Sequence, residues 1–284
     1  MRPNASIQQP KITKPKWSGG GFQDFDFMKN FLRNNTPGWI KIVSKKALYR
    51  VYRLTEAFYR LPVDKYDFQT TELIRQHLKK DSNCIDIGAN QGHILMEIVA
   101  AAPKGKHFAF EPIPDLYTSL KKRFSKNTTV YNYALSSAKG STTFNYYPGR
   151  PAVSGFRERN NHVGQVPTLL SVQVEKLDDL IPEDVTIDLI KIDVEGAEFE
   201  VLEGAKKVLI KNKPLVLFEC GLGGADVYGT TPTQLFDLFS ECGLAISTIE
   251  YFNARKKPFS KEEFNGQFYK NYNFFFIAYE PANY

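Results

Sequence analysis

The sequence predicts an α/β fold in which a mostly parallel sheet is covered by helices, and three observations carry that prediction. After Pro62 the pattern alternates between short apolar runs and helical periods, which is typical of parallel strands connected by helices. A glycine-rich turn follows the first apolar run. Two further apolar segments close the chain, and they predict an antiparallel hairpin at the C-terminal edge of the sheet.

Each element between Pro62 and Leu180 has its own signal. The segment TTELIRQHLKK has the apolar spacing of a helix, and NCIDI is a strand that leads into the glycine-rich turn. HILMEIVAAA is then a helix, HFAFE a second strand, LYTSLKKRFSK a helix, and TVYNYAL a third strand. Within residues 136–180 the alternation stops, and STTFNYYPG and LLSVQVEKL predict two strands joined by a polar loop.

Regular alternation resumes after Leu180. IDLIKID predicts the fourth strand, Gly196 to Ile210 one helix, PLVLFE the fifth strand, and Pro232 to Cys242 another helix. LAISTIEYF and NFFFIAYEP are the two closing strands, and the charged connection between them has little helical signal. We therefore expect residues 63–284 to form one domain.

Residues 1–62 differ from the rest of the chain and predict a basic tail followed by a helical arm from Phe25 to Leu61. Residues 1–60 carry 12 lysines or arginines and three acids, so their net charge is +9 while that of the whole chain is +6. The arm either packs on the main domain with solvated lysines or docks on an anionic partner, such as a membrane face or a phosphorylated carrier. No nucleic-acid-binding signature accompanies the charge, so nucleic acid is not favoured.

Composition places the chain among globular proteins. Its 284 residues are 42% hydrophobic, and no apolar stretch reaches the length that spans a bilayer. The amino terminus lacks the apolar core of a signal peptide, so we expect a cytoplasmic location. Cys84, Cys220 and Cys242 lie in or beside apolar runs and are expected in the core, and the four histidines are too scattered to predict a zinc site.

The turn after the first strand has the composition of a ligand-binding loop. Asp86, Gly88, Asn90 and Gly92 stand between a strand and an amphipathic helix, where a glycine turn lets a ligand approach the backbone. Asparagine fits the middle position because it tolerates the left-handed conformation. A glycine-rich turn that serves packing alone is an equally good interpretation of these residues.

Glu111 strengthens the ligand interpretation, because it ends the second strand 25 residues after Asp86. An acid at that position can accept hydrogen bonds from two ribose hydroxyls. The dinucleotide fingerprint would require glycine at Asn90 and at His93, and both differ. S-adenosylmethionine has no phosphates and makes less demand on this turn, so it is the favoured cofactor.

Further acids follow the fourth and fifth strands, at the edge where an open parallel sheet binds its ligands. Asp193 is the first candidate for a base or for a group that orients an acceptor hydroxyl, and Glu195 and Glu219 come next. The same three carboxylates would suit a divalent cation, which is an alternative but is not favoured. Glu198 is as easily a first-turn acid that stabilises its helix.

The motifs IDIGANQG, FEPIP, NYAL, KLDDL and, above all, IDLIKIDVEGAEFEVLEGA resemble those of the FkbM family of S-adenosylmethionine-dependent methyltransferases. The resemblance runs in order from about Tyr66 to Glu219. It implies a Rossmann-like seven-stranded methyltransferase fold whose last strand runs antiparallel to the others. It also implies methyl transfer, usually to an oxygen of a sugar, a polyketide or a related small molecule. Residues 1–62 lie outside it.

Carried over position by position, the resemblance gives each candidate a role. It implies that Asp193 lies between cofactor and acceptor, and that Glu111 holds the ribose. Ala134 and Leu135 would border the adenine, although plain core positions explain them equally well. The methionine moiety would be surrounded by Asp86, Gly88, Asn90 and Gly92.

Residues 136–180 are the predicted acceptor-side insertion. They contain a set that can stack on a sugar ring and pair with a phosphate or carboxylate, namely Arg150, Arg157 and Arg159 with Tyr146, Tyr147 and Phe156. The stretch DVEG after the fourth strand lacks the N/D-P-P-Y/F run that holds base amines, which favours a hydroxyl or carboxylate acceptor. We expect a sugar, a glycoconjugate or another small metabolite.

Two other functions stay open. A binding protein that keeps the fold without turnover would use the basic arm to attach to an anionic surface. An NAD-dependent oxidoreductase shares the acid after the second strand but lacks the third glycine and an obvious Tyr-Lys pair.

Overall fold

The computed structural model of the chain describes residues 65–159 and 166–283. These residues belong to one structural unit, Pro62–Tyr284. The helical arm expected between Phe25 and Leu61, and the tail before it, lie outside the described residues.

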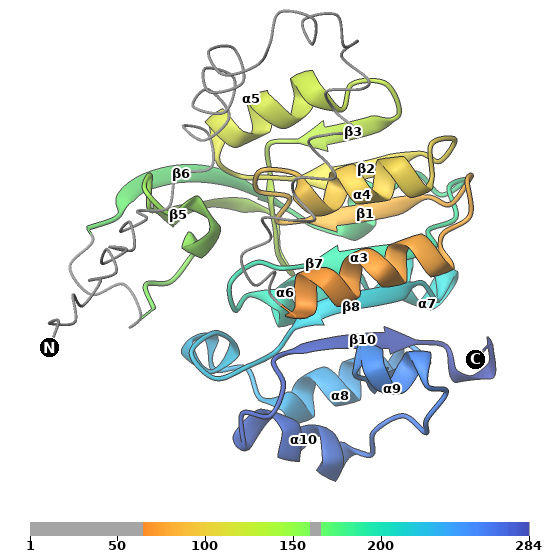
Figure 1. The fold of residues 1–284 in the computed structure, drawn as a ribbon. Helices are drawn as coiled ribbons and strands as arrows, with labels where there is room; N and C mark the ends of the chain where they lie inside the picture. Colours follow the sequence, from red (N-terminus) through yellow and green to blue (C-terminus); the bar gives the residue numbers. More distant parts are fainter. Residues whose placement is uncertain (1–64, 160–165, 284) are drawn as a thin grey trace, which may run out of the picture. The chain divides into compact units, whose positions relative to one another are not determined.

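A seven-stranded sheet forms the centre of the described residues (Figure 1). In spatial order its strands are β3 (Thr128–Tyr131), β2 (His107–Phe110), β1 (Cys84–Ile87), β7 (Leu189–Ile192), β8 (Leu215–Glu219), β10 (Phe275–Tyr279) and β9 (Ala245–Ser247). The first five run parallel, whereas β10 is antiparallel to both β8 and β9. This topology confirms the predicted α/β fold with its mostly parallel sheet and antiparallel C-terminal edge.

The central strands are buried on both faces, which explains why they appear in the sequence as unbroken apolar runs. Every residue of β1, β2 and β7 is buried. One face is covered by α3 (Lys65–His77), α4 (His93–Ala101), α5 (Pro114–Arg123) and α9 (Ile249–Asn253). The other face is covered by α6 (Glu198–Glu203), α7 (Lys206–Asn212), α8 (Pro232–Glu241) and α10 (Lys261–Tyr269).

The predicted third strand is in fact two short strands in different sheets. β3 ends at Tyr131, and the Asn132 side chain donates to the backbone oxygens of Glu111 and Pro112 at 2.9 and 3.0 Å, which fixes a turn there. The chain then enters a second sheet of three strands, in the order β4 (Ala134–Leu135), β6 (Thr168–Glu175) and β5 (Gly140–Tyr146). β5 and β6 confirm the two strands expected within residues 136–180.

The helix expected from Gly196 to Ile210 is broken into α6 and α7. At Gly204 a Cβ would lie 2.2 Å from the backbone oxygen of Ser136, so the helix stops where two backbones touch. The carboxylate of Asp178 accepts the backbone N–H of Lys207 and of Val208 at 3.0 and 2.9 Å, and these bonds start the second helix.

The C-terminal region contains two helices that were not expected. The strand predicted from LAISTIEYF stops after Ser247, because the Thr248 side chain accepts the N–H of Tyr251 at 3.2 Å and begins α9. The charged connection holds α10, which starts with a capping box between Ser260 and Glu263. Short 3₁₀ helices span Pro151–Val153, Leu177–Asp179, Ala225–Tyr228 and Pro281–Asn283.

All three cysteines are buried and unpaired, which confirms their expected place in the core. Among the helices of residues 65–159 and 166–283, none has the length and hydrophobicity that crossing a bilayer requires.

Candidate functional site

The turn between β1 and α4 has the backbone shape that its sequence predicts. Gly88, Asn90 and Gly92 have φ values of 72°, 47° and 78°, in the region that glycine enters freely and asparagine tolerates. Gly88 meets a second constraint, because a Cβ there would lie 1.9 Å from the backbone oxygen of Asp193. The turn therefore lies directly against the end of the neighbouring strand β7, and glycine alone fits at this position.

Glu111, just after β2, connects two turns through its carboxylate. Its Oε2 accepts the backbone N–H of Asn90 at 2.7 Å, and its Oε1 accepts that of Ile113 at 2.9 Å. The residue is 3% exposed, and burial raises its pKa to about 7 although both backbone bonds oppose the shift. Each oxygen has a second lone pair, so the carboxylate can accept further bonds from a ligand.

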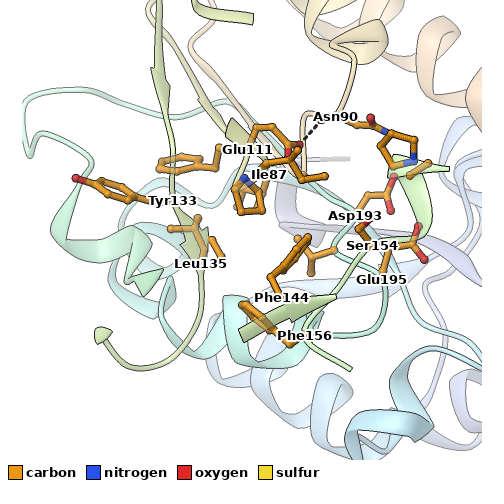
Figure 2. A pocket seen from close by; sticks show the side chains of 18 of the residues that line it. Ile87, Asn90, Glu111, Tyr133, Leu135, Phe144, Ser154, Phe156, Asp193 and Glu195 are labelled. Carbon is orange, nitrogen blue, oxygen red and sulfur yellow. Dashed lines mark hydrogen bonds between the residues drawn. The ribbon is translucent and has the colours of Figure 1, made fainter. Parts of the chain in front are cut away.

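A cavity of about 230 Å³ opens at the carboxyl ends of β1, β2 and β7 (Figure 2). Figure 2 shows Glu111 joined to Asn90 at this cavity, with Asp193 and Glu195 also along its wall. Most of the candidates from the sequence are brought together here, namely Gly88, Asn90, Glu111, Ala134, Leu135, Asp193, Glu195 and Glu219.

Aromatic and small side chains that the sequence did not single out complete the wall. Tyr133 comes from the connection between β3 and β4, and Phe144 and Ser154 come from the second sheet and the loop after it. Phe144 meets Phe156 edge to face, with ring centroids 5.8 Å apart. An apolar, aromatic wall opposite a few polar groups is the usual construction of a site for a small ligand with a flat ring.

Three carboxylates from neighbouring strands line the cavity, as their positions at strand ends predict. Asp193 and Glu195 follow β7, and Glu219 ends β8. Burial and the charge of Asp193 raise the pKa of Glu195 to about 8. Burial and the neighbouring acids raise the pKa of Glu219 well above its usual value. Glu195 has a φ of 62°, which is unusual for a residue other than glycine and marks a constrained position.

A buried lysine that the sequence analysis missed lies beneath the turn. Lys191 Nζ donates to the backbone oxygen of Gly88 at 2.9 Å and lies 3.4 Å from Asp86 Oδ1 and 3.3 Å from Asp193 Oδ2. Although burial lowers the pKa of Lys191, the carboxylates of Asp193 and Asp86 raise it more, so the ammonium stays charged. Its one signal in the sequence is a charge inside the apolar run IDLIKID.

Asp86 and Gly92 do not line the cavity, contrary to their expected place around the ligand. The Asp86 side chain is 1% exposed and faces Lys191. A Cβ at Gly92 would lie 2.5 Å from the Leu120 side chain, so this glycine lets α4 start against α5. Asp86 and Gly92 therefore support the turn between β1 and α4 without lining the first cavity.

A second cavity of about 270 Å³ shares Glu195 and Glu219 with the first. Arg159 lines it and forms an ion pair with Glu195. The other residues that line it are Gly196, Glu198, Gly221, Leu222, Gly223, Gly224, Ala225 and Phe274.

Of the expected acceptor contacts, Arg159 lines the second cavity and Phe156 lines the first. Arg157 donates to the backbone oxygen of Val227 at 2.7 Å and lies over the Tyr228 ring. These contacts give the Arg157 side chain a structural role. Arg150 is exposed outside both cavities. Tyr147 is 2% exposed, and a buried ring cannot stack on a sugar, which corrects that expectation.

Glu198 has the structural role that the sequence left open. Its Oε1 accepts the backbone N–H of Val194 at 3.1 Å and of Gly196 at 3.2 Å, which holds the turn after β7. Within the described residues, no group of three or more His, Cys, Asp or Glu side chains is arranged to hold a metal ion.

Glu198→Gln is expected to reduce the loss of stability that occurs as the pH rises from about 4.5 through about 7. Burial raises the folded-state pKa of Glu198 from 4.5 to about 7, so its contribution to stability is complete below 4.5 and is lost as the pH rises through about 7. Glutamine keeps the acceptor oxygen and cannot ionise. Thermal unfolding at about pH 6 and about pH 8.5 should show a smaller fall in the midpoint for the variant than for the wild type. An equal fall would contradict this.

The segment that builds the site matches a known family model, and related proteins are found over the same part of the chain. Residues 86–244 match the model of the methyltransferase FkbM domain. AMB antimetabolite synthetase AmbE of Pseudomonas aeruginosa is 30% identical over 178 residues, which are 49% of this chain and 8% of that protein. The chain thus spans a small part of that relative.

Two further relatives are named as methyltransferases. 2-O-methyltransferase NoeI of Sinorhizobium fredii is 29% identical over 150 residues, 48% of this chain and 62% of that protein. Hexuronic acid methyltransferase AglP of Haloferax volcanii is 26% identical over 191 residues, 65% of this chain and 76% of that protein.

Proposed function

Because the chain belongs to the methyltransferase FkbM family, we propose that it transfers a methyl group from S-adenosylmethionine to a hydroxyl oxygen of a sugar, a glycoconjugate or another small metabolite. One observation carries the proposal: the cavity has Glu111, bonded to the glycine-rich turn, and the acids after β7 and β8 along one continuous wall. This is the edge where an open parallel sheet binds its ligands. The names of NoeI and AglP support a carbohydrate oxygen as the acceptor.

The residues of the first cavity fit the cofactor group by group. Glu111 would accept hydrogen bonds from the ribose hydroxyls through its remaining lone pairs. Tyr133, Ala134 and Leu135 would flank the adenine, and the turn at Gly88 would leave room for the methionine moiety. The bound cofactor supplies an electrophilic methyl group on a sulfonium.

Two acids of the first cavity, Asp193 and Glu219, are assigned different roles in the reaction. The reaction needs the acceptor oxygen held in line with the methyl group, at about 3 Å, and its proton removed. Lys191 pairs with Asp193 and fixes it beside the cofactor turn, which suits orientation of the acceptor hydroxyl. The Glu219 side chain forms no ion pair or hydrogen bond with another described residue, and its raised pKa suits a group that takes the proton. We therefore assign Glu219 as the base and Asp193 as the orienting group.

The test is formation of S-adenosylhomocysteine by the purified full chain, in a screen of acceptors that begins with neutral and acidic sugar glycosides. We expect turnover that depends on both the cofactor and one acceptor class. Binding of S-adenosylmethionine without turnover on any acceptor would favour a retained fold that binds without catalysis. A nicotinamide-dependent reaction would show instead as oxidation of NADH. We do not expect it, because the dinucleotide fingerprint requires glycines where this chain has Asn90 and His93.

A further inference from the structure

The second cavity is placed where an acceptor would have to lie. It shares Glu195 and Glu219 with the cofactor cavity, so a molecule bound in it would lie against the proposed base. Its far wall is the segment from Gly221 to Ala225, which follows β8 directly. Gly196 packs against this wall so closely that a Cβ on it would lie 2.6 Å from the backbone oxygen of Gly224. The cavity therefore keeps its shape through contact between two backbones.

The rim of the second cavity is apolar. Leu222 is 47% exposed and Phe274 is 37% exposed, although both line the cavity. Phe274 packs edge to face against Tyr66, with ring centroids 4.4 Å apart. An exposed aromatic face above a polar floor suits a sugar-like ring, which has C–H groups on one face and hydroxyls around its edge.

The charges around the second cavity disfavour an anion. Glu195, Glu198 and Glu219 line it, and Asp193 adjoins them at the first cavity. The cations nearby are already engaged, because Arg159 pairs with Glu195 and Lys191 pairs with Asp86 and Asp193. A ligand carboxylate or phosphate would have to compete with the carboxylates that already pair with these cations. This differs from the expectation that Arg159 pairs with an anionic acceptor.

The polar groups on this wall suit hydroxyls instead. Carboxyl groups accept hydrogen bonds from hydroxyls and, when protonated, also donate to them. Burial raises the pKa of Glu195 to about 8, so both forms are available near neutrality. Arg159 Nε is buried without a hydrogen-bond partner among the described residues.

We propose that the second cavity is the acceptor site and that it binds an uncharged, hydroxyl-rich ring in preference to an anionic one. As an acceptor assignment this rests on the proposed methyltransferase function, whereas the binding preference is independent of the cofactor. Glu219 then stands between the two ligands, in contact with both cavities.

The test is saturation-transfer NMR of the full chain without cofactor, using methyl α-glucoside and its uronate as matched probes. We expect transfer to the neutral probe and about fivefold or more weaker transfer to the uronate. Glu219→Gln keeps the shape and removes a carboxyl group that becomes charged as the pH rises, so at alkaline pH it should increase transfer to the uronate. Equal or stronger transfer to the uronate in the wild type, or no transfer to either probe, would overturn the proposal.

Location is tested with Leu222→Ala and Phe274→Ala, which should both weaken transfer to the neutral probe. Leu222 is exposed, so its variant keeps the test valid if loss of the Phe274 ring impairs folding. Tyr269→Ala is the matched control, because Tyr269 is 60% exposed and lines neither cavity. Undiminished transfer in both cavity variants would place the probe elsewhere and overturn the proposal. If the full chain prefers the neutral probe to the uronate but does not bind S-adenosylmethionine, the proposed function is refuted. The binding preference of the second cavity then still stands.

Discussion

Lys191→Met is expected to lower the free energy of unfolding by about 3–5 kcal/mol, because it leaves the carboxylate of Asp86 buried without its cation. It also removes the 2.9 Å hydrogen bond that holds the backbone oxygen of Gly88, so the cofactor turn loses its support. Urea unfolding measures the first effect, and the dissociation constant of S-adenosylmethionine measures the second.

Two comparisons separate this effect from general damage. Lys206→Met is the matched control, because Lys206 forms a surface pair with Glu241 and its loss should cost at most about 1 kcal/mol. Adding Asp86→Asn to Lys191→Met should recover part of the lost stability, since the unpaired charge is then gone. Equal stability of Lys191→Met and Lys206→Met would show that the buried pair is not the support described.

Glu219→Gln is expected to reduce kcat by about 10²–10⁴-fold with little change in cofactor affinity, because it removes the proposed base and keeps its shape. The pKa of Glu219 is raised by burial and by the neighbouring acids. The wild-type rate should therefore rise with pH through that raised value, since the base acts when deprotonated. The variant should lack this rise.

The measurement is S-adenosylhomocysteine formation across pH with the acceptor found in the screen. Glu241→Gln, a surface carboxylate variant, is the control and should retain the wild-type profile. An unchanged kcat in Glu219→Gln would exclude Glu219 as the base and return that role to Asp193.

Much of the fold was predictable from the sequence, because parallel strands buried on both faces leave unbroken apolar runs separated by helical periods. Only some of the elements that were wrong depend on contacts between distant residues. Gly204 breaks a continuous helical pattern because it touches Ser136 on another segment. The helix α10 had a local signal in Ser260 and Glu263, which its high charge obscured.

The site was predictable where a residue type at a strand end limits the chemistry. Glu111, Asp193 and Glu219 follow from that rule, and all three line the first cavity. Lys191 was missed because two of its partners, Asp86 and Gly88, lie on another segment, and nothing local reveals that it will reach them. The engagement of Arg157 with Val227 and Tyr228 is equally non-local. Local sequence therefore indicates the cofactor side better than the acceptor side.

The most direct test is calorimetric titration of the full chain with S-adenosylmethionine, S-adenosylhomocysteine and NADH, repeated on Glu111→Ala. Glu111 holds Asn90 and Ile113 by hydrogen bonds of 2.7 and 2.9 Å, and it is the proposed ribose ligand. We predict binding of both sulfur compounds with dissociation constants of about 10⁻⁶ M, at least about tenfold weaker binding in the variant, and no binding of NADH. Failure of both sulfur compounds to bind the wild type would contradict the assignment of the first cavity.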